Sequence, residues 1–168
     1  GAGGTFVCLE TATGKERWKK SLRQDFGGQK PNWGFSESPL VDGDLVVFSP
    51  GGPDGTIVAL NKKTGATVWR TKEITDTPHY SSIISVKIDG VEQYIQLTVQ
   101  SVVGVAPQDG HLLWRAARRG STAVIPTPIY HANHVYVTSG YGAGCNLFKI
   151  SSEDGKFKAE ENFSLQFL

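Results

Sequence analysis

Short runs of apolar and β-branched residues alternate with turn-forming residues along most of the chain. Examples are the runs at 45–48, 56–60, 94–99 and 135–138. Runs of this length and residue type are typical of β-strands. No stretch of about 12 residues shows the apolar spacing of three to four residues that marks an amphipathic helix. The pattern therefore predicts an all-β chain.

The dipeptide Asp-Gly separates several of these runs. It begins at Asp42, Asp54, Asp89, Asp109 and Asp154. Both residues tolerate the positive φ that tight hairpin turns require. The chain is therefore expected to form a series of β-hairpins.

A longer pattern also recurs along the chain. It reads CLETATGKERW at 8–18, ALNKKTGATVW at 59–69 and GVAPQDGHLLW at 104–114, with a degraded copy, KISSEDGKFKA, at 149–159. The turn glycines at positions 14, 65, 110 and 155 are 51, 45 and 45 residues apart. Four antiparallel strands in about 45 residues are the signature of a β-propeller blade.

The repeats predict consecutive four-stranded antiparallel β-propeller blades, about three complete and one half. The expected units are a half blade at 5–20, blades at 36–71, 80–116 and 123–161, and the start of a next blade or a tail at 162–168. Closed propellers have about four to eight blades. Since the 168 residues also contain no methionine, we expect either a piece of a larger ring or self-association that completes one.

Charge and cysteine content exclude several classes of protein. The 17 basic and 16 acidic residues leave a net charge of +1, with no basic stripe for nucleic acid. No apolar run approaches the roughly 20 residues that span a bilayer. Cys8 and Cys145 are too few for a disulfide scaffold, and we expect buried free thiols.

The repeats resemble the tryptophan-docking motif of quinoprotein-like β-propellers, Ala-x-Asp-x-x-Thr-Gly-x-x-x-Trp. The segments 33–39 and 138–145 are similar to PQQ-like propeller proteins of planctomycete-type bacteria. That family includes alcohol dehydrogenases dependent on pyrroloquinoline quinone (PQQ) and a non-enzymatic outer-membrane assembly lipoprotein. The resemblance implies the fold and a periplasmic or secreted location. It does not imply an activity, because one fold hosts unrelated functions.

The motif also implies which residues join adjacent blades. The expected docking residues are Trp18, Trp69 and Trp114, with the turn glycines Gly14, Gly65 and Gly110. An indole docked between blades removes a large apolar area from water and needs a partner for its N–H. Glu10, Asn61 and Ala106 depart from the motif's Asp, and Ala159 replaces its last Trp. The last interface is therefore expected to be weaker.

Propeller ligands bind near the inner strands, where two segments carry aromatic and hydroxyl side chains. The expected ligand-binding residues are Trp33, Ser36, Tyr80 and Ser81. Trp33 could stack a planar ring or a sugar, or it could cap a loop. Glu37 and His79 are catalytic candidates as an acid–base pair. The alternative is that both are hydrogen-bonding residues of the channel.

Other polar clusters give weaker signals. His131 and His134 have no third ligand nearby in sequence, so no metal site is expected. Arg115, Arg118 and Arg119 could clamp an anion, or lie in an exposed loop between blades. The segment 140–144 is rich in glycine but lacks the Lys of a phosphate loop, so we expect bends between strands.

The leading functional expectation is a non-catalytic scaffold or binding module of a bacterial extracytoplasmic protein. One alternative is part of a quinoprotein-type oxidoreductase. Family enzymes hold the quinone with adjacent cysteines and bind calcium, whereas Cys8 and Cys145 are far apart in sequence and no calcium set can be assigned. The chain is expected to need no cofactor, although a longer parent could hold PQQ with calcium. The other alternative is a propeller that binds a small molecule, carbohydrate or peptide through Trp33 and Tyr80.

Overall fold

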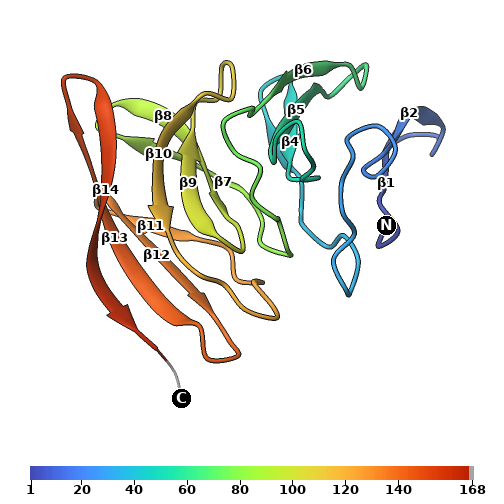
Figure 1. Ribbon diagram of the computed structural model, residues 1–168. Helices are drawn as coiled ribbons and strands as arrows, with labels where there is room; N and C mark the ends of the chain where they lie inside the picture. Colours follow the sequence, from blue (N-terminus) through green and yellow to red (C-terminus); the bar gives the residue numbers. More distant parts are fainter. Residues whose placement is uncertain (167–168) are drawn as a thin grey trace.

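The computed structural model describes residues 1–166, which form four separate antiparallel sheets (Figure 1). The first sheet contains β1 (Thr5–Leu9) and β2 (Glu16–Ser21). The second contains β3 (Leu40–Asp42), β4 (Leu45–Phe48), β5 (Val58–Asn61) and β6 (Thr67–Arg70). The third contains β7 (Ile84–Ile88), β8 (Val91–Leu97), β9 (Ser101–Val105) and β10 (Leu112–Ala117). The fourth contains β11 (Ile129–His131), β12 (His134–Ser139), β13 (Gly144–Glu153) and β14 (Lys156–Leu165).

Each sheet is a meander in which strands pair in chain order. Short turns join most neighbouring strands of a sheet, and several of these turns place Asp or Gly at positive φ. A longer loop, residues 49–57, joins β4 to β5. The part of the chain that the structure describes contains no helix, and therefore none long and apolar enough to cross a membrane. The predicted all-β fold of propeller blades is confirmed.

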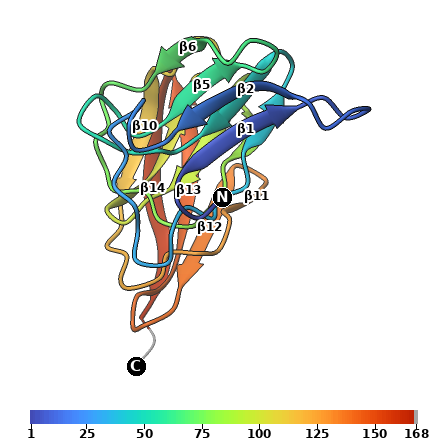
Figure 2. The ribbon, with the colours of Figure 1, turned by 90° about the vertical axis from the view of Figure 1, so that its right-hand side faces the viewer.

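The sheets stack face to face in chain order, from β1–β2 at one end to β11–β14 at the other (Figures 1 and 2). Three apolar clusters fill the spaces between them. All residues of β9, and the apolar residues of β5, are buried. Such continuous burial is expected of strands that are covered on both faces. The stacking therefore supplies the core.

The fourth hairpin departs from the other three copies of the repeat. In the first three, an amide such as Gly65 N–H donates to the carbonyl four residues earlier, and the loop has four residues. In the fourth, Glu153 pairs with Lys156 across a two-residue turn at Asp154 and Gly155. Both turn residues have positive φ, as in the tight hairpin turn that Asp-Gly favours.

The last strand is longer than expected. Pairing between β13 and β14 continues past a β-bulge at Asn162 as far as Cys145 and Leu165. Residues 162–165 therefore extend this sheet and do not begin another blade, which corrects the expectation for 162–168; residues 167–168 of that segment lie outside the described residues.

Cys145 is buried and Cys8 half-buried, and both are free thiols.

Candidate functional site

The loops that precede β3 and β7 bring the predicted ligand residues together. The Trp33 backbone N–H donates to the Tyr80 hydroxyl at 3.3 Å, and their ring centroids are 5.8 Å apart. The His79 ring lies 5.1 Å from that of Tyr80. Tyr80 is buried, whereas Trp33 is 59% exposed. The Trp33 indole therefore forms an accessible aromatic surface beside a buried tyrosine.

Glu37 anchors a polar network that crosses three sheets. Its carboxylate accepts hydrogen bonds from the Ser49 backbone N–H at 2.8 Å and hydroxyl at 3.2 Å. Gln96 Nε2 donates to Ser49 Oγ at 2.7 Å and to the Ser81 carbonyl at 3.2 Å. The Ser81 hydroxyl donates to the Pro126 carbonyl at 3.0 Å. These contacts give Glu37 and Ser81 a role in joining the sheets.

Burial dominates the electrostatics of Glu37. Part of the residue's surface is accessible, but its carboxyl group is enclosed by protein. This desolvation raises the pKa of Glu37 from 4.5 to about 8, and the hydrogen bonds from Ser49 oppose the shift only in part. Burial also lowers the pKa of His79. Both environments favour the neutral side chain.

Glu37 and His79 line the same small cavity of about 170 Å³, together with Phe35 and Phe48. They do not hydrogen-bond to each other: the carboxylate binds Ser49, and His79 Nδ1 faces the Val124 N–H at 3.5 Å. The structure therefore gathers the two catalytic candidates without joining them as an acid–base pair. Ser36 does not line this cavity.

The described residues do not match the requirements of a PQQ site. Trp33 and Tyr80 are tilted by 54°, so they present no parallel pair to a planar quinone. Within 1–166 there is no group of three or more His, Cys, Asp or Glu side chains suited to a metal ion. His131 and His134 are directly opposite each other at a strand end, without a third such ligand. We derive no quinone chemistry from these residues.

Trp18 joins the first sheet to the second. Its indole N–H donates to the Lys62 carbonyl at 2.9 Å, in the turn between β5 and β6. The ring lies on Gly65, where a Cβ would approach Trp18 Cγ to 2.8 Å. The turn glycine is therefore required by close approach as well as by its positive φ.

Trp69 repeats this contact at the next interface. Its indole N–H donates to the Pro107 carbonyl at 2.8 Å. The ring lies over Gly110 and stacks on Tyr94, at 6.4 Å between ring centroids. At both interfaces, an indole on one sheet contacts the turn of the next.

Trp114 does not dock in this way. It is buried between the third and fourth sheets, but its N–H donates to Gln93 Oε1 of its own sheet at 2.7 Å. The ring covers Gly104, which stands where the earlier repeats have Cys8 and Ala59. No atom lies within 4 Å of the Cβ position at Gly155. Trp114 therefore lies between two sheets, but its hydrogen bond and its contact with Gly104 stay within its own sheet.

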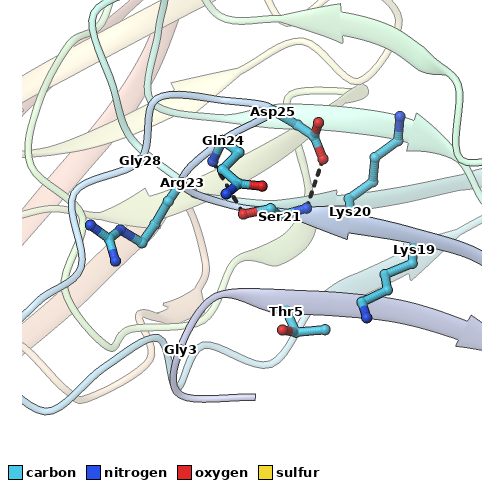
Figure 3. Close-up of a pocket in the computed structure, with 9 residues that line it drawn as sticks. All are labelled: Gly3, Thr5, Lys19, Lys20, Ser21, Arg23, Gln24, Asp25 and Gly28. Atoms are coloured by element: carbon cyan, nitrogen blue, oxygen red, sulfur yellow. Dashed lines mark hydrogen bonds between the residues drawn. The ribbon is translucent and has the colours of Figure 1, made fainter.

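A basic surface at the first sheet has no counterpart in the sequence predictions (Figure 3). Lys19, Lys20 and Arg23 line an open depression of about 820 Å³. Asp25 accepts a hydrogen bond from the Ser21 N–H at 2.7 Å within it. The adjacent lysines were the only signal in the sequence. The surface is shallow and its cations are solvated, so it does not by itself define a ligand.

The stacked sheets and their tryptophan contacts define a quinoprotein-like β-propeller module. The sequence matches the family described as outer membrane protein assembly factor BamB over residues 1–163, and the chain belongs to that family. This confirms the resemblance inferred from the repeats. The chain is therefore a propeller module of the scaffold or binding kind.

A structural relative supports the fold. The crystal structure of BamB from Moraxella catarrhalis superposes with a TM-score of 0.62 at 20% sequence identity. The match covers 98% of this chain and 48% of that protein, so the chain spans about half of its relative's length. No curated protein matches the sequence.

Proposed function

We propose that the chain is a protein-binding propeller module that binds another propeller sheet through the outward face of β11–β14. One observation carries the proposal: a row of apolar side chains crosses this face. Ile129 pairs with Tyr136, Tyr136 with Leu147, and Leu147 with Phe163, so the row spans all four strands. Ile129 is 61% exposed and Phe163 is 51% exposed.

The inner faces of the same stack indicate what such a row binds. On β12, Val135 and Val137 point into the core between the third and fourth sheets, whereas Tyr136 lies on the opposite face. Each of the three apolar clusters of the core is formed by the facing sides of two neighbouring sheets. Exposed apolar patches of this kind mark interaction sites. A further sheet is therefore the occupant that the fold itself favours.

The sheet at the other end of the stack offers a complementary face. Val7 and Leu9 are exposed on the outward face of β1–β2, while Phe6 packs inward against Phe48. The adjacent turn has Gly14 at φ +71°, close to the values in the turns that Trp18 and Trp69 contact. No atom lies within 4 Å of the Cβ position at Gly14. We therefore propose a second copy of the chain as partner, seated head to tail.

The mass of the protein in solution tests this proposal. Light scattering is expected to give a weight-average mass that rises above 18.2 kDa with concentration. The variant Ile129→Lys/Phe163→Lys is expected to stay monomeric, because two buried charges would oppose sheet stacking. Val41→Lys/Val91→Lys, which changes exposed residues of the two middle sheets, serves as the matched control and is expected to associate. A monomer at all concentrations, or unimpaired association of the first variant, refutes the proposal.

The proposal includes a periplasmic or secreted location. Its support is the family description, which names an assembly factor of outer membrane protein. Fractionation of cells that express the full-length gene tests it. Recovery of the protein in the cytoplasmic fraction alone would exclude this location.

A further inference from the structure

A second polar cavity lies at the end of the stack that carries the fourth sheet. It has a volume of about 690 Å³ and lies between the segment after β10 and the glycine-rich turn that joins β12 to β13. Arg118 and Arg119 line it from one side, and Tyr141 to Ala143 from the other. It is separate from the cavity that contains Glu37 and His79.

Arg118 is buried without a compensating charge. Only 5% of the residue is exposed. Its Nε donates to Asn146 Oδ1 at 3.0 Å, and its Nη2 donates to Ser139 Oγ and to the Gly144 carbonyl, both at 2.9 Å. All three acceptors are neutral. Nη1 is buried and has no hydrogen-bond partner among residues 1–166.

Two other arginines of the chain, both more exposed than Arg118, have carboxylate partners. Arg70 lies within 3.8 Å of the Asp54 carboxylate, and Arg115 within 2.6 Å of that of Asp76. No Asp or Glu of the described chain lies within ion-pair distance of Arg118. A buried charge without a counter-charge is costly, and burial lowers the pKa of Arg118 accordingly. An external anion would offset this cost.

Arg119 adds a second positive charge beside Arg118, and Glu161 adds a negative charge that binds Asn146. Arg119 is exposed, lines the same cavity and forms no ion pair within the described residues. Glu161 accepts a hydrogen bond from Asn146 Nδ2 at 2.7 Å. Asn146 thus lies between the two charged residues: its amide nitrogen donates to Glu161, and its amide oxygen accepts from Arg118.

We propose that this cavity binds an oxyanion, the carboxylate or phosphate group of a small ligand. The exposed guanidinium of Arg119 supplies its N–H donors, and the buried, unpaired charge of Arg118 adds electrostatic attraction. Guanidinium groups form strong charge-assisted hydrogen bonds to both kinds of oxyanion. By comparison, Lys19 and Arg23 of the first depression are exposed and Lys20 is half-buried, and none of the three has a buried side-chain nitrogen without a partner.

Calorimetric titration with inorganic phosphate, and separately with acetate, tests the proposal at ionic strength held constant with chloride. Saturable binding of either anion supports it, and the tighter of the two identifies the chemical group. Arg119→Gln is expected to weaken binding by about 10-fold, as for the loss of one charge-assisted hydrogen bond. Glu161→Gln is expected to tighten it severalfold by removing a nearby negative charge.

Arg23→Gln is the matched control, since Arg23 lies in the other basic depression. It is expected to leave the affinity unchanged. Substitution of Arg118 would remove contacts that hold the fold. Arg119→Gln and Glu161→Gln change exposed residues and keep the test decisive. The proposal is overturned if neither anion binds, or if Arg23→Gln weakens binding as much as Arg119→Gln does.

Discussion

Replacing each turn glycine by alanine is expected to lower the free energy of unfolding, least at Gly14, more at Gly65 and most at Gly110. The three glycines have φ of +71°, +72° and +73°, in turns closed by the same backbone hydrogen bonds. An alanine therefore has the same conformational cost at each, about 1 kcal/mol. What differs is the indole above the turn.

The magnitude follows from the space at each Cβ position. At Gly14 there is no atom within 4 Å, so only the conformational cost remains. At Gly65 the new methyl would lie 2.8 Å from Trp18 Cγ, where about 3.5–4.0 Å is comfortable. At Gly110 it would lie closer still to Trp69 Cε3. Overpacking adds about 1–3 kcal/mol, so we expect losses of about 1, 2 and 3–4 kcal/mol in turn.

Urea unfolding followed by far-UV circular dichroism measures these differences. Gly155→Ala is a second control, because Gly155 has φ +75° and no neighbour within 4 Å, and it lies in a different sheet from Gly14. In a Trp69→Ala background, Gly110→Ala should cost no more than Gly14→Ala, since the clash is gone. Equal losses at Gly14 and Gly110 within about 0.5 kcal/mol would show that the indole contact does not constrain the turn.

Two further predictions concern buried polar groups. The pKa of Glu37 is raised from 4.5 to about 8 in the folded state, so between these pH values the folded protein holds a proton that the unfolded chain releases. The free energy of unfolding should therefore fall as pH rises from 4.5 to 8, by a few kcal/mol. Glu37→Gln should remove that component from the urea midpoints at pH 5, 7 and 9, and parallel profiles would contradict the assignment. Trp114→Phe leaves Gln93 Oε1 unpaired in a fully buried side chain and should cost about 1–3 kcal/mol. Trp18→Phe frees the carbonyl of Lys62, which is only half-buried, and should cost less than about 1 kcal/mol in the same assay. The reverse order would refute this reasoning.

The blades and the residue types at their interfaces could be predicted because each copy of the repeat carries a Trp and a turn Gly, although the turn that each indole contacts was seen only in the structure. Trp18 and Gly65 occupy fixed positions of successive copies, as do Trp69 and Gly110. In the structure, the indole of one copy meets the turn glycine of the next.

The partner of Trp114 could not be predicted in this way, because Gln93 lies outside the motif. The choice between Gln93 and the next turn depends on a local difference, Gly104 in place of the bulkier Ala59. The same limit applies to Glu37 and His79. Sequence order predicted that their loops meet, but Ser49, which binds the carboxylate, has no position in any recognised pattern.

The fourth sheet lacks the docking Trp of the repeat, and both the proposed partner surface and the proposed anion site involve it. Positions that seat an indole or its turn are fixed by packing, whereas the fourth hairpin has Ala159 and a two-residue turn instead. Its side chains are thereby released from the docking contact. The same sheet carries the apolar row ending at Phe163 and contributes the groups that surround Arg118. If these are separate sites, the changes in association by Phe163→Lys and in anion affinity by Arg119→Gln should combine additively; strong coupling would mean that partner and anion share one surface.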